Sequence, residues 1–317
     1  MKILAIRFAR LGDVLLLLPA LRSLKEKFPD SQLVFLTGHR CAPVAQMCSF
    51  IDQVISVDRI AMRDGPLLKA IRDMTALVKT VRKGRFDFVI DFHSFRETNL
   101  LTWFSGAPKR LGLKRHQAAY WSFCFNQPPV FEDKSIHVAD MFQRVVGGNR
   151  SSGRVLTIPG AAQDPKKLVL YVDAPVADRV WPAEGFAAVA DFAVERLNAD
   201  VLIISSPEGA SRALKVRDAS VHSRRLGVNT NLSLPDLAAT IASARLLVSN
   251  DTGPMHIGPA VGVPTLGLFS VGYPEHFRPI GPNDRYLRAN PIEKIETRDV
   301  IANVEEMWVM AGRDLRR

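Results

Sequence analysis

The stretch from Val248 to Phe269 reads VSNDTGPMHIGPAVGVPTLGLF and contains two short apolar runs separated by a polar turn and a helical segment. Asp251, Thr252 and Gly253 follow the first run directly. Pro254 then stands near the first position of the expected helix, where its fixed backbone angle is favourable. A strand, a helix and a second strand in this order predict a parallel βαβ unit.

The turn that opens this helix has two interpretations. Amide N–H groups at a helix start bind anions, and Gly253 would allow a phosphate to approach the backbone closely. Alternatively, Asp251 or Thr252 only caps the helix. The residues alone leave both interpretations open. Because a carboxylate repels an anion, Asp251 is better suited to accepting hydrogen bonds from sugar hydroxyls beside the phosphates.

The same alternation of short apolar runs and longer amphipathic segments extends along the whole chain. The expected strands begin at Lys2, Gln32, Gln53, Asp87, Lys167, Ala199, Arg245 and Pro264. The expected helices include residues 20–28, 66–83, 183–197 and 234–244. Such alternation predicts parallel sheets covered by helices, and two such sets predict an α/β protein with two Rossmann-like domains.

We expect the boundary between the domains in residues 147–167, which are rich in Gly, Pro, Ser and charge. This gives an N-terminal domain of residues 1–150 and a C-terminal domain of residues 151–317. A length of 317 residues with 47% hydrophobic content is sufficient for two cores. Ligands of open α/β sheets bind outside the carboxyl ends of the strands, so we expect the site in a cleft between the domains.

The formal net charge of +10 favours an acidic partner, namely nucleic acid, anionic lipid or a phosphorylated substrate, although a basic surface without a specific partner is the alternative. No nucleic-acid recognition motif is present. Three cysteines without a CxxC pair and seven dispersed histidines argue against a disulfide framework or a metal site. The N-terminus reads as a strand and no apolar run is long enough to span a bilayer, so we expect a soluble, intracellular protein.

The stretch from Arg10 to Ala20 reads RLGDVLLLLPA and places one carboxylate, Asp13, directly before a long apolar run. Asp13 is either the N-cap of a helix or a catalytic base at the end of the first strand. Pro19 is expected to kink or restart that helix. The local sequence leaves both roles of Asp13 open.

Two further stretches carry cationic side chains. In DRVWPAEGF, from Asp178 to Phe186, Arg179 precedes a corner that leads into a helix, so its guanidinium could face a phosphate, whereas Trp181 is expected to be a packing anchor. In KRLGLKRH, from Lys109 to His116, the basic residues form either a solvated face or a patch that binds an anionic acceptor. The chain has no P-loop, GxGxxG, GxSxG or HExxH motif, which favours a transfer or binding reaction without a metal.

Together these stretches resemble glycosyltransferase family 9, the heptosyltransferases that build the inner core of lipopolysaccharide. The segments that carry the resemblance are RFARLGDVLLLLPALRSLKEKFP, DFVIDFHSFRETNLL, DRVWPAEGFAAVAD and SNDTGPMHIGPAVGVPTLGLF. They occur in the family's order and span nearly the whole chain. The resemblance implies a GT-B fold, in which two Rossmann-like domains with parallel sheets face a central cleft and the last helix packs back on the N-terminal domain.

The resemblance also implies roles for individual residues. Asp13 matches the general base, and Asp251 matches the residue that contacts the sugar. Thr252 and Gly253 match contacts to the diphosphate, and Arg179 stands where the family has a lysine. His256 lies in the same donor-site segment. The implied reaction transfers heptose from ADP-heptose with inversion, and it uses no bound metal or cofactor.

The implied acceptor is an anionic, lipid-linked oligosaccharide bound by the N-terminal domain, and nucleic acid is not an expected partner. We expect Arg10, Arg110, Lys114 and Arg115 to bind its charged groups. The protein would then work at the cytoplasmic face of the inner membrane as a peripheral protein, held partly by its positive charge. Two alternatives remain at this point: a GT-B nucleotide-sugar 2-epimerase, and a degenerate GT-B protein that serves as a binding or assembly partner.

Overall fold

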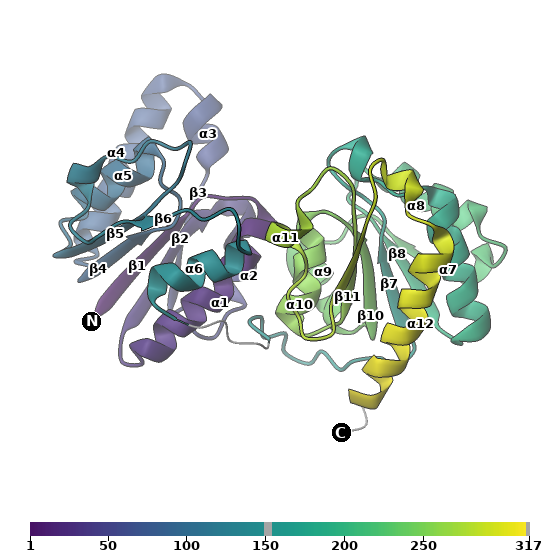
Figure 1. Cartoon of the computed structure of the whole chain (residues 1–317). Helices are drawn as coiled ribbons and strands as arrows, with labels where there is room; N and C mark the ends of the chain where they lie inside the picture. Colours follow the sequence, from purple (N-terminus) through teal and green to yellow (C-terminus); the bar gives the residue numbers. More distant parts are fainter. Residues whose placement is uncertain (149–153, 315–317) are drawn as a thin grey trace. The chain divides into compact units, whose positions relative to one another are not determined.

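The computed structural model describes residues 1–148 and 154–314, which form two compact units, Met1–Ser151 and Ser152–Arg317. Each unit is a parallel sheet with helices on both faces (Figure 1). The two Rossmann-like α/β halves that the sequence predicted are therefore confirmed. The exact boundary expected between residues 150 and 151 lies outside the described residues.

The sheet of the first unit has the strand order β3-β2-β1-β4-β5-β6, with every neighbouring pair parallel. Its strands are β1 (Lys2–Arg7), β2 (Gln32–Gly38), β3 (Gln53–Val57), β4 (Phe88–Asp91), β5 (Lys109–Lys114) and β6 (Val130–Phe131). The chain runs outward from β1 through β2 to β3, then returns to start again at β4. The order therefore reverses between β1 and β4, as in dinucleotide-binding folds.

Helices cover both faces of this sheet, with α1 and α6 on one face and α4 and α5 on the other (Figure 1). They are α1 (Leu11–Lys27), α2 (Ala42–Gln46), α3 (Arg59–Asp64), α4 (Leu67–Lys83), α5 (Arg96–Phe104) and α6 (Val138–Val146). Leu4 and Ile6 of β1 pack with Leu77 and Val81 of α4. Because both faces are covered, β1 is a continuous apolar run instead of an alternating one.

The sheet of the second unit has the order β12-β11-β10-β7-β8-β9, which repeats the same arrangement with its reversal between β7 and β10. Its strands are β7 (Lys167–Tyr171), β8 (Asp200–Ile204), β9 (Gly227–Asn229), β10 (Leu246–Asn250), β11 (Thr265–Phe269) and β12 (Arg285–Arg288). Its helices are α7 (Ala183–Arg196), α8 (Ala210–Ala219), α9 (Leu234–Ala242), α10 (Ile257–Val261), α11 (Pro274–Phe277) and α12 (Thr297–Asp314).

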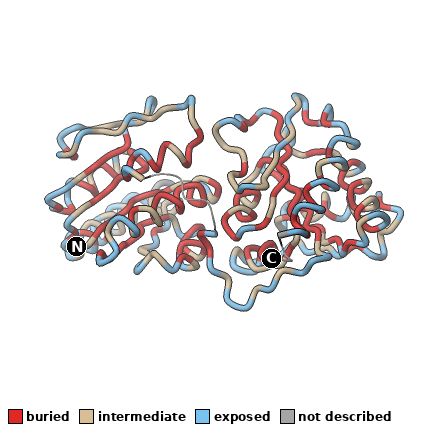
Figure 2. The backbone as a smooth tube through the Cα atoms, turned by 60° about the horizontal axis from the view of Figure 1, so that its bottom comes forward, coloured by how far each residue is buried: buried red, intermediate tan, exposed pale blue. Residues whose placement is uncertain are grey.

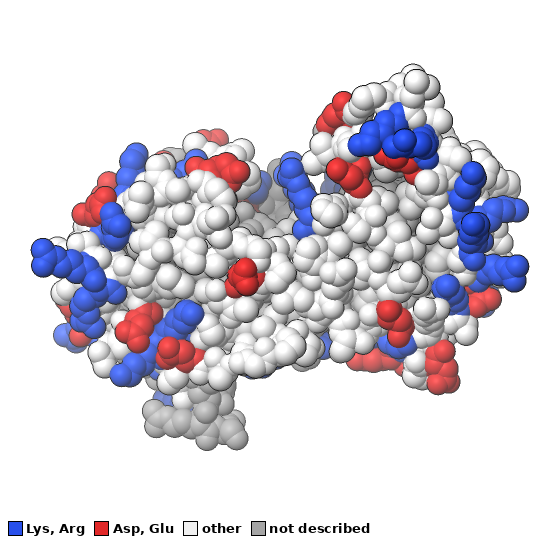
Figure 3. All heavy atoms as spheres, turned by 180° about the vertical axis from the view of Figure 1, so that it is seen from behind, with Lys and Arg blue, Asp and Glu red and all other residues white. Residues whose placement is uncertain are grey.

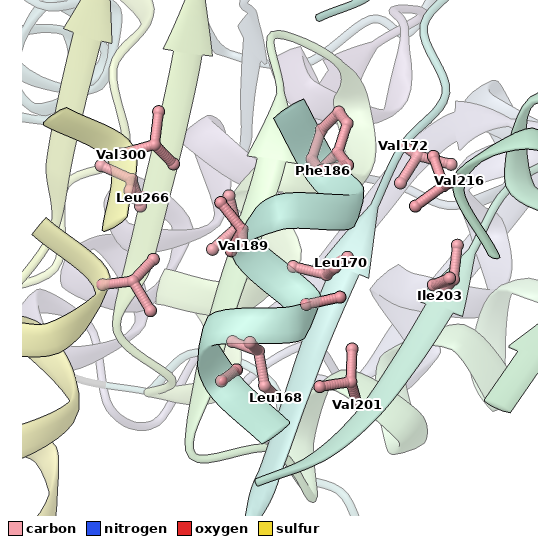
Figure 4. Close-up of a cluster of buried hydrophobic side chains, with 14 of the residues drawn as sticks. Leu168, Leu170, Val172, Phe186, Val189, Val201, Ile203, Val216, Leu266 and Val300 are labelled. Carbon is pink, nitrogen blue, oxygen red and sulfur yellow. The ribbon is translucent and has the colours of Figure 1, made fainter. Parts of the chain in front are cut away.

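The core of the second unit lies between its sheet and the helices α7, α8 and α12. Figure 4 shows Phe186 and Val189 of α7 in one buried cluster with Leu170 of β7, and Val300 of α12 beside Leu266. The apolar face of α12 packs against α7 and β10 of its own unit. In both units the central strands are buried along their length and the connecting loops are exposed (Figure 2).

All eight strands expected from the sequence are present, and their ends differ from the expected ends by no more than two residues. The first helix starts at Leu11, close to the start expected at Asp13, and it runs through Pro19 to Lys27 without restarting there, so the expected range of residues 20–28 was too short. A proline inside a helix costs about 3 kcal/mol. Every side chain from Val14 to Leu21 is buried, and burial of each large apolar side chain contributes about 1.5–3 kcal/mol. The packing therefore outweighs the lost hydrogen bond.

The segment after β10 also differs from the expectation of one helix. It is a 3-10 turn, Gly253–His256, followed by the five-residue helix α10. Among the helices of the described residues, none combines the length and the apolar character needed to cross a membrane.

Replacing Phe186 with alanine tests the core of the second unit. Phe186 is fully buried, so Phe186→Ala is expected to lower the free energy of unfolding of this unit by about 3–5 kcal/mol. Urea unfolding measures the loss, and hydrogen exchange of the β7 and β8 amides assigns it to the second unit. Val221→Ala is the control, since Val221 is 78% exposed and its loss is expected to change stability by less than about 0.5 kcal/mol.

Candidate active site

Each sheet has a reversal of strand order at its centre, and ligands of open α/β sheets bind at the carboxyl ends of the strands beside such a reversal. In the first unit these strands are β1 and β4, which end at Arg7 and Asp91. In the second unit they are β7 and β10, which end at Tyr171 and Asn250. We therefore describe the two candidate sites separately, one for each unit.

Asp13 and Arg7 form an ion pair at the end of β1. Asp13 is the third residue of α1, and its Oδ1 accepts a hydrogen bond from Nη2 of Arg7 at 3.0 Å. The Asp13 side chain is 29% exposed, whereas that of Arg7 is 4% exposed. The N-cap position belongs to Arg10, so the interpretation of Asp13 as the helix cap is wrong. The carboxylate is thus fixed on one side and accessible on the other.

Arg7 is held rigidly below this carboxylate. Its Nη1 donates to the carbonyl of Phe92 at 2.6 Å, and its guanidinium lies 5.0 Å from the ring centre of Phe142 on α6. Burial lowers the pKa of Arg7, and the charge of Asp13 opposes that shift. Because a guanidinium keeps its proton over the whole physiological range, Arg7 supplies a permanent positive charge beside Asp13.

Asp91 and His93, which sequence reasoning did not select, lie beside the Arg7–Asp13 pair. Asp91 is paired in register with Ile6 of β1. Its Oδ1 accepts from the amides of His93 at 2.8 Å and Ser94 at 2.9 Å. Burial raises the pKa of Asp91 to about 6, against the lowering effect of these amides and of Arg7. Polar residues directly after an apolar strand that neighbours β1 are the signal that could have identified them.

His93 is buried between the rings of Phe8 and Phe95, whose centres lie 5.8 and 4.0 Å from its own. Neither ring nitrogen of His93 has a hydrogen-bond partner in the structure. Burial, with the charges of Arg7 and Arg59, lowers the pKa of His93 to about 2. His93 is therefore a neutral imidazole at the pH values at which enzymes work.

The predicted acceptor-binding residues do not all lie together. Arg10 is exposed beside the end of β1, and Lys114 and Arg115 follow at the carboxyl end of β5. Arg115 donates to Glu132 at 3.2 Å, and its charge adds to the effect of burial in lowering the pKa of Arg7. Arg110 is separate from this group.

Arg110 is the second residue of β5 and lies toward the amino end of the strand. Its Nε donates to the carbonyl of Cys124 at 3.0 Å and its Nη1 to that of Ala107 at 2.6 Å. These bonds give Arg110 a structural role away from Asp13. On the face that Figure 3 shows, Lys and Arg side chains lie in several separate groups with Asp and Glu between them. That face therefore has no single continuous basic patch.

Asp251 and Arg179 form the corresponding pair in the second unit. Nη1 of Arg179 lies 3.2 Å from Oδ2 of Asp251, which is 6% exposed. Burial raises the pKa of Asp251 and the charge of Arg179 opposes the shift. The same Oδ2 of Asp251 packs so closely against Gly272 that a Cβ would not fit there. Nε of Arg179 is buried without a hydrogen-bond partner in the structure.

Asn250 and Trp181 hold Arg179 beside the end of β10. The Oδ1 of Asn250 accepts from the backbone amide of Trp181 at 3.1 Å, and its Nδ2 donates to the carbonyl of Val172 at 3.0 Å. The indole of Trp181 is buried and donates to the carbonyl of Ile295 at 3.1 Å. Trp181 is therefore the packing anchor that the sequence predicted.

Thr252, Gly253 and His256 lie on the turn after Asp251. Thr252 is the N-cap of the 3-10 turn, and its side chain makes no capping hydrogen bond. The capping interpretation is therefore wrong for Asp251, which pairs with Arg179, and for Thr252. His256 is buried at the junction with α10. Because α10 has five residues, its dipole is smaller than that of the longer helix expected from the sequence.

Asp173 is a second carboxylate at this edge that sequence reasoning did not select. It follows β7, and it accepts hydrogen bonds from Arg212, from the hydroxyl of Ser206 and from the amide of Ala174. These contacts join the end of β7 to the start of α8. Within residues 1–148 and 154–314, no group of three His, Cys, Asp or Glu side chains has the arrangement of a metal site.

Residues 150–305 match the family profile of glycosyltransferase family 9, described as heptosyltransferase. The chain is 23% identical over 303 residues to the lipopolysaccharide core heptosyltransferase OpsX of Haemophilus influenzae, a match that covers 89% of this chain and 82% of the relative. The family profile covers most of the second unit, and the similarity to this relative extends over both units.

Solved structures show the same fold over the whole length. A family 9 glycosyltransferase from Veillonella parvula superposes with a TM-score of 0.84 at 23% identity, covering 98% of this chain and 97% of the other. The E. coli heptosyltransferase WaaC, solved with ADP and also with ADP-2-deoxy-2-fluoro heptose, superposes in its ADP form with a TM-score of 0.82 at 19% identity, covering 97% and 100%. This chain has the GT-B fold and belongs to glycosyltransferase family 9, the heptosyltransferase family.

Proposed function

We propose that this glycosyltransferase moves a heptose from ADP-heptose to an inner-core sugar of lipopolysaccharide, with inversion at the anomeric carbon and without a bound metal or cofactor. The acceptor is supported by the relative named as a lipopolysaccharide core heptosyltransferase. The donor is supported by the related enzyme solved with ADP and with a fluorinated ADP-heptose. Similarity to a glycosyltransferase family favours this reaction over the epimerase and over the non-catalytic binding partner.

The observation that carries the proposal is the ion pair of Arg7 and Asp13 at the strand reversal of the first unit. A general base must be ionised, accessible and fixed in position. Nη2 of Arg7 holds Oδ1 of Asp13 at 3.0 Å, and the exposed part of Asp13 is accessible to an acceptor hydroxyl. His93 stays neutral and adds no second positive charge beside Arg7.

In the proposed reaction, the acceptor oxygen forms a bond to the anomeric carbon as the bond from that carbon to the diphosphate breaks. The proton of the acceptor hydroxyl passes to Asp13. The leaving ADP carries the electron pair of the broken bond and must be stabilised by fixed positive groups. Because the oxygen attacks from the face opposite the diphosphate, the anomeric configuration inverts.

We assign stabilisation of the diphosphate to Arg179 and to the backbone at Thr252 and Gly253. Arg179 has a buried Nε without a hydrogen-bond partner in the structure, and a guanidinium can pair with two phosphate oxygens. It would supply the positive charge that a metal ion provides in other transferases. Asp251 would then accept hydrogen bonds from sugar hydroxyls, held in place by Arg179 and Gly272.

We assign binding of the anionic acceptor to Arg10, Lys114 and Arg115 at the carboxyl edge of the first unit. A lipid-linked acceptor places the reaction at a membrane surface, for which we propose the cytoplasmic face of the inner membrane. The formal net charge of +10 would support attachment to anionic lipids there.

Substitution of Asp13 tests the proposed base. Asp13→Asn keeps the shape of the side chain but cannot accept the proton, so kcat is expected to fall by about 10²–10⁴-fold. The assay follows ADP release with ADP-heptose and a heptose-deficient core acceptor, and ADP affinity is expected to stay unchanged. Asp30→Asn, at an exposed carboxylate, is the control. Activity of Asp13→Asn within a few-fold of wild type would contradict the assignment.

Calorimetric titration with ADP, UDP, GDP and CDP tests the donor site. We expect selective binding of ADP, weakened at least about tenfold by Arg179→Ala because a charge-assisted pair is lost. Arg179→Lys retains the charge and should bind with intermediate affinity. Arg217→Ala removes an exposed arginine of the same unit and should bind ADP as wild type does. A preference for another nucleotide would overturn the proposed donor.

The pH dependence of the free energy of unfolding tests the shifted pKa values of the buried residues Asp91 and His93. Unfolded histidine binds a proton below pH 6.5, whereas folded His93 has a pKa of about 2, so stability is lost as the pH falls below 6.5, by about 1.4 kcal/mol per unit. Folded Asp91 has a pKa of about 6 against an ordinary value of 3.8, so the folded state binds this proton more tightly than the unfolded state. The resulting stabilisation of the fold is fully present below pH 3.8 and is lost as the pH rises through 6.

The two substitutions are therefore expected to shift stability in opposite directions on acidification. Relative to wild type, His93→Gln should gain stability below pH 6.5, and Asp91→Asn should lose stability as the pH falls from 6 to 3.8. Urea unfolding at a series of pH values measures both differences, and the double variant should show partial cancellation. Curves for His93→Gln that run parallel to wild type would contradict a neutral buried His93.

A further inference from the structure

A group of large apolar side chains on the first unit is exposed to solvent. It lies on α3 and α4, which are joined through Gly65 and Pro66. The exposed fractions are 47% for Ile60, 75% for Leu67, 83% for Leu68 and 54% for Ile71. We call these four residues the apolar tip. Single exposed apolar residues are ordinary, but an exposed group of this kind marks an interaction surface.

Leu67 and Ile71 of the apolar tip continue a face of α4 that is buried farther along the helix. Apolar residues of α4 recur at intervals of three or four, the spacing of one helical face, and they are Leu67, Ile71, Met74, Val78 and Val81. In the second half of the helix this face packs into the core through Leu77 and Val81. In the first half of the helix the same face is exposed, at Leu67 and Ile71. The apolar face of α4 is therefore longer than the part that packs against the first unit.

Positive charges accompany this surface. Lys69 lies between Leu68 and Ile71 and is exposed. The side chain of Arg72 is 76% exposed, and its Nε lies 3.5 Å from Oδ1 of Asp73. A helix that combines exposed leucines with lysine and arginine binds the interface of an anionic bilayer, where the apolar side chains enter the headgroup region and the cations meet lipid phosphates. In a symmetric contact with a second copy, the same patch would meet itself and its cations would approach one another.

The first residue of α3 contacts residues of the candidate active site in the first unit. Arg59, the first residue of α3, donates from Nη1 to the carbonyl of Phe8 at 3.4 Å, and its guanidinium lies 4.9 Å from the ring centre of Phe95. Phe8 and Phe95 are the two rings that enclose His93. Since α3 follows the carboxyl end of β3, the apolar tip projects from the same edge of the sheet as Asp13.

We propose that the apolar tip is the membrane-docking surface of this enzyme and inserts Leu67, Leu68 and Ile71 into the interface of an anionic phospholipid bilayer. The proposal rests on the proposed function in one respect, because a lipid-linked acceptor is what requires the edge of Asp13 to meet a membrane. Docking through this tip brings that edge to the surface in which the acceptor is anchored.

Sedimentation with vesicles tests the proposal. Wild-type protein is expected to bind vesicles of phosphatidylethanolamine and phosphatidylglycerol, and to bind vesicles of phosphatidylcholine alone more weakly. The double variant Leu67→Ser/Leu68→Ser should lose at least about tenfold in vesicle affinity, since two large apolar side chains no longer enter the interface. Val221→Ser is the matched control, because Val221 is 78% exposed on the second unit.

Insertion of the apolar tip into the bilayer is measured with a second variant. In Leu68→Trp, the fluorescence maximum of the added tryptophan, taken as a difference from wild type, should shift to shorter wavelength when phosphatidylglycerol vesicles are added. The substituted positions are exposed, so all variants should keep the ADP affinity of the wild type. Loss of vesicle binding with unchanged ADP affinity supports the proposal.

Three outcomes would overturn it. One is unchanged vesicle binding in Leu67→Ser/Leu68→Ser. Another is a loss of binding in Phe104→Ser instead, since Phe104 is exposed at the end of α5 near the opposite edge of the sheet. The third is a dimer in analytical ultracentrifugation that only the leucine variant disrupts. Failure to bind ADP, with vesicle binding through the tip intact, would overturn the proposed function and leave the docking surface standing.

Discussion

The reversal of strand order beside the first strand of each sheet is the constraint on which the candidate site depends. At that point the chain leaves β1 toward β2 and leaves β4 toward β5, so the connections diverge and the carboxyl ends of the two strands stay open. The second unit repeats this at β7 and β10. An arginine–aspartate pair lies at each opening, Arg7 with Asp13 and Arg179 with Asp251.

The two pairs differ in burial, and the difference fits their proposed roles. In the first, the arginine is buried and the carboxylate is partly exposed, which suits a base that must reach an acceptor hydroxyl. In the second, the side chain of Asp251 is 9% exposed and that of Arg179 is 31% exposed, which suits a cation that meets a diphosphate. Buried charges are tolerated only when they are paired or hydrogen-bonded. Each pair therefore stabilises its own site while presenting one member to substrate.

Much of the fold was predictable because parallel sheets buried on both faces require continuous apolar strands. The eight expected strands were found for that reason. The course of α1 through Pro19 was not predictable, since the local preference of proline was overruled by burial on all sides. The hydrogen-bond partners of Arg110 were not predictable either, because its bonds to the carbonyls of Ala107 and Cys124 depend on how a loop packs beside β5.

The sequence by itself determined the alternation of strands and helices, the family, and the positions of Asp13, Arg179 and Asp251 within its motifs. Only the tertiary structure decided which residues contact one another: Asp251 pairs with Arg179, far away along the chain, and Asp91 lies beside β1. It also decided that half of the apolar face of α4 is buried and half exposed. Local sequence sets backbone preference, whereas burial and pairing arise from segments that meet only when the sheet assembles.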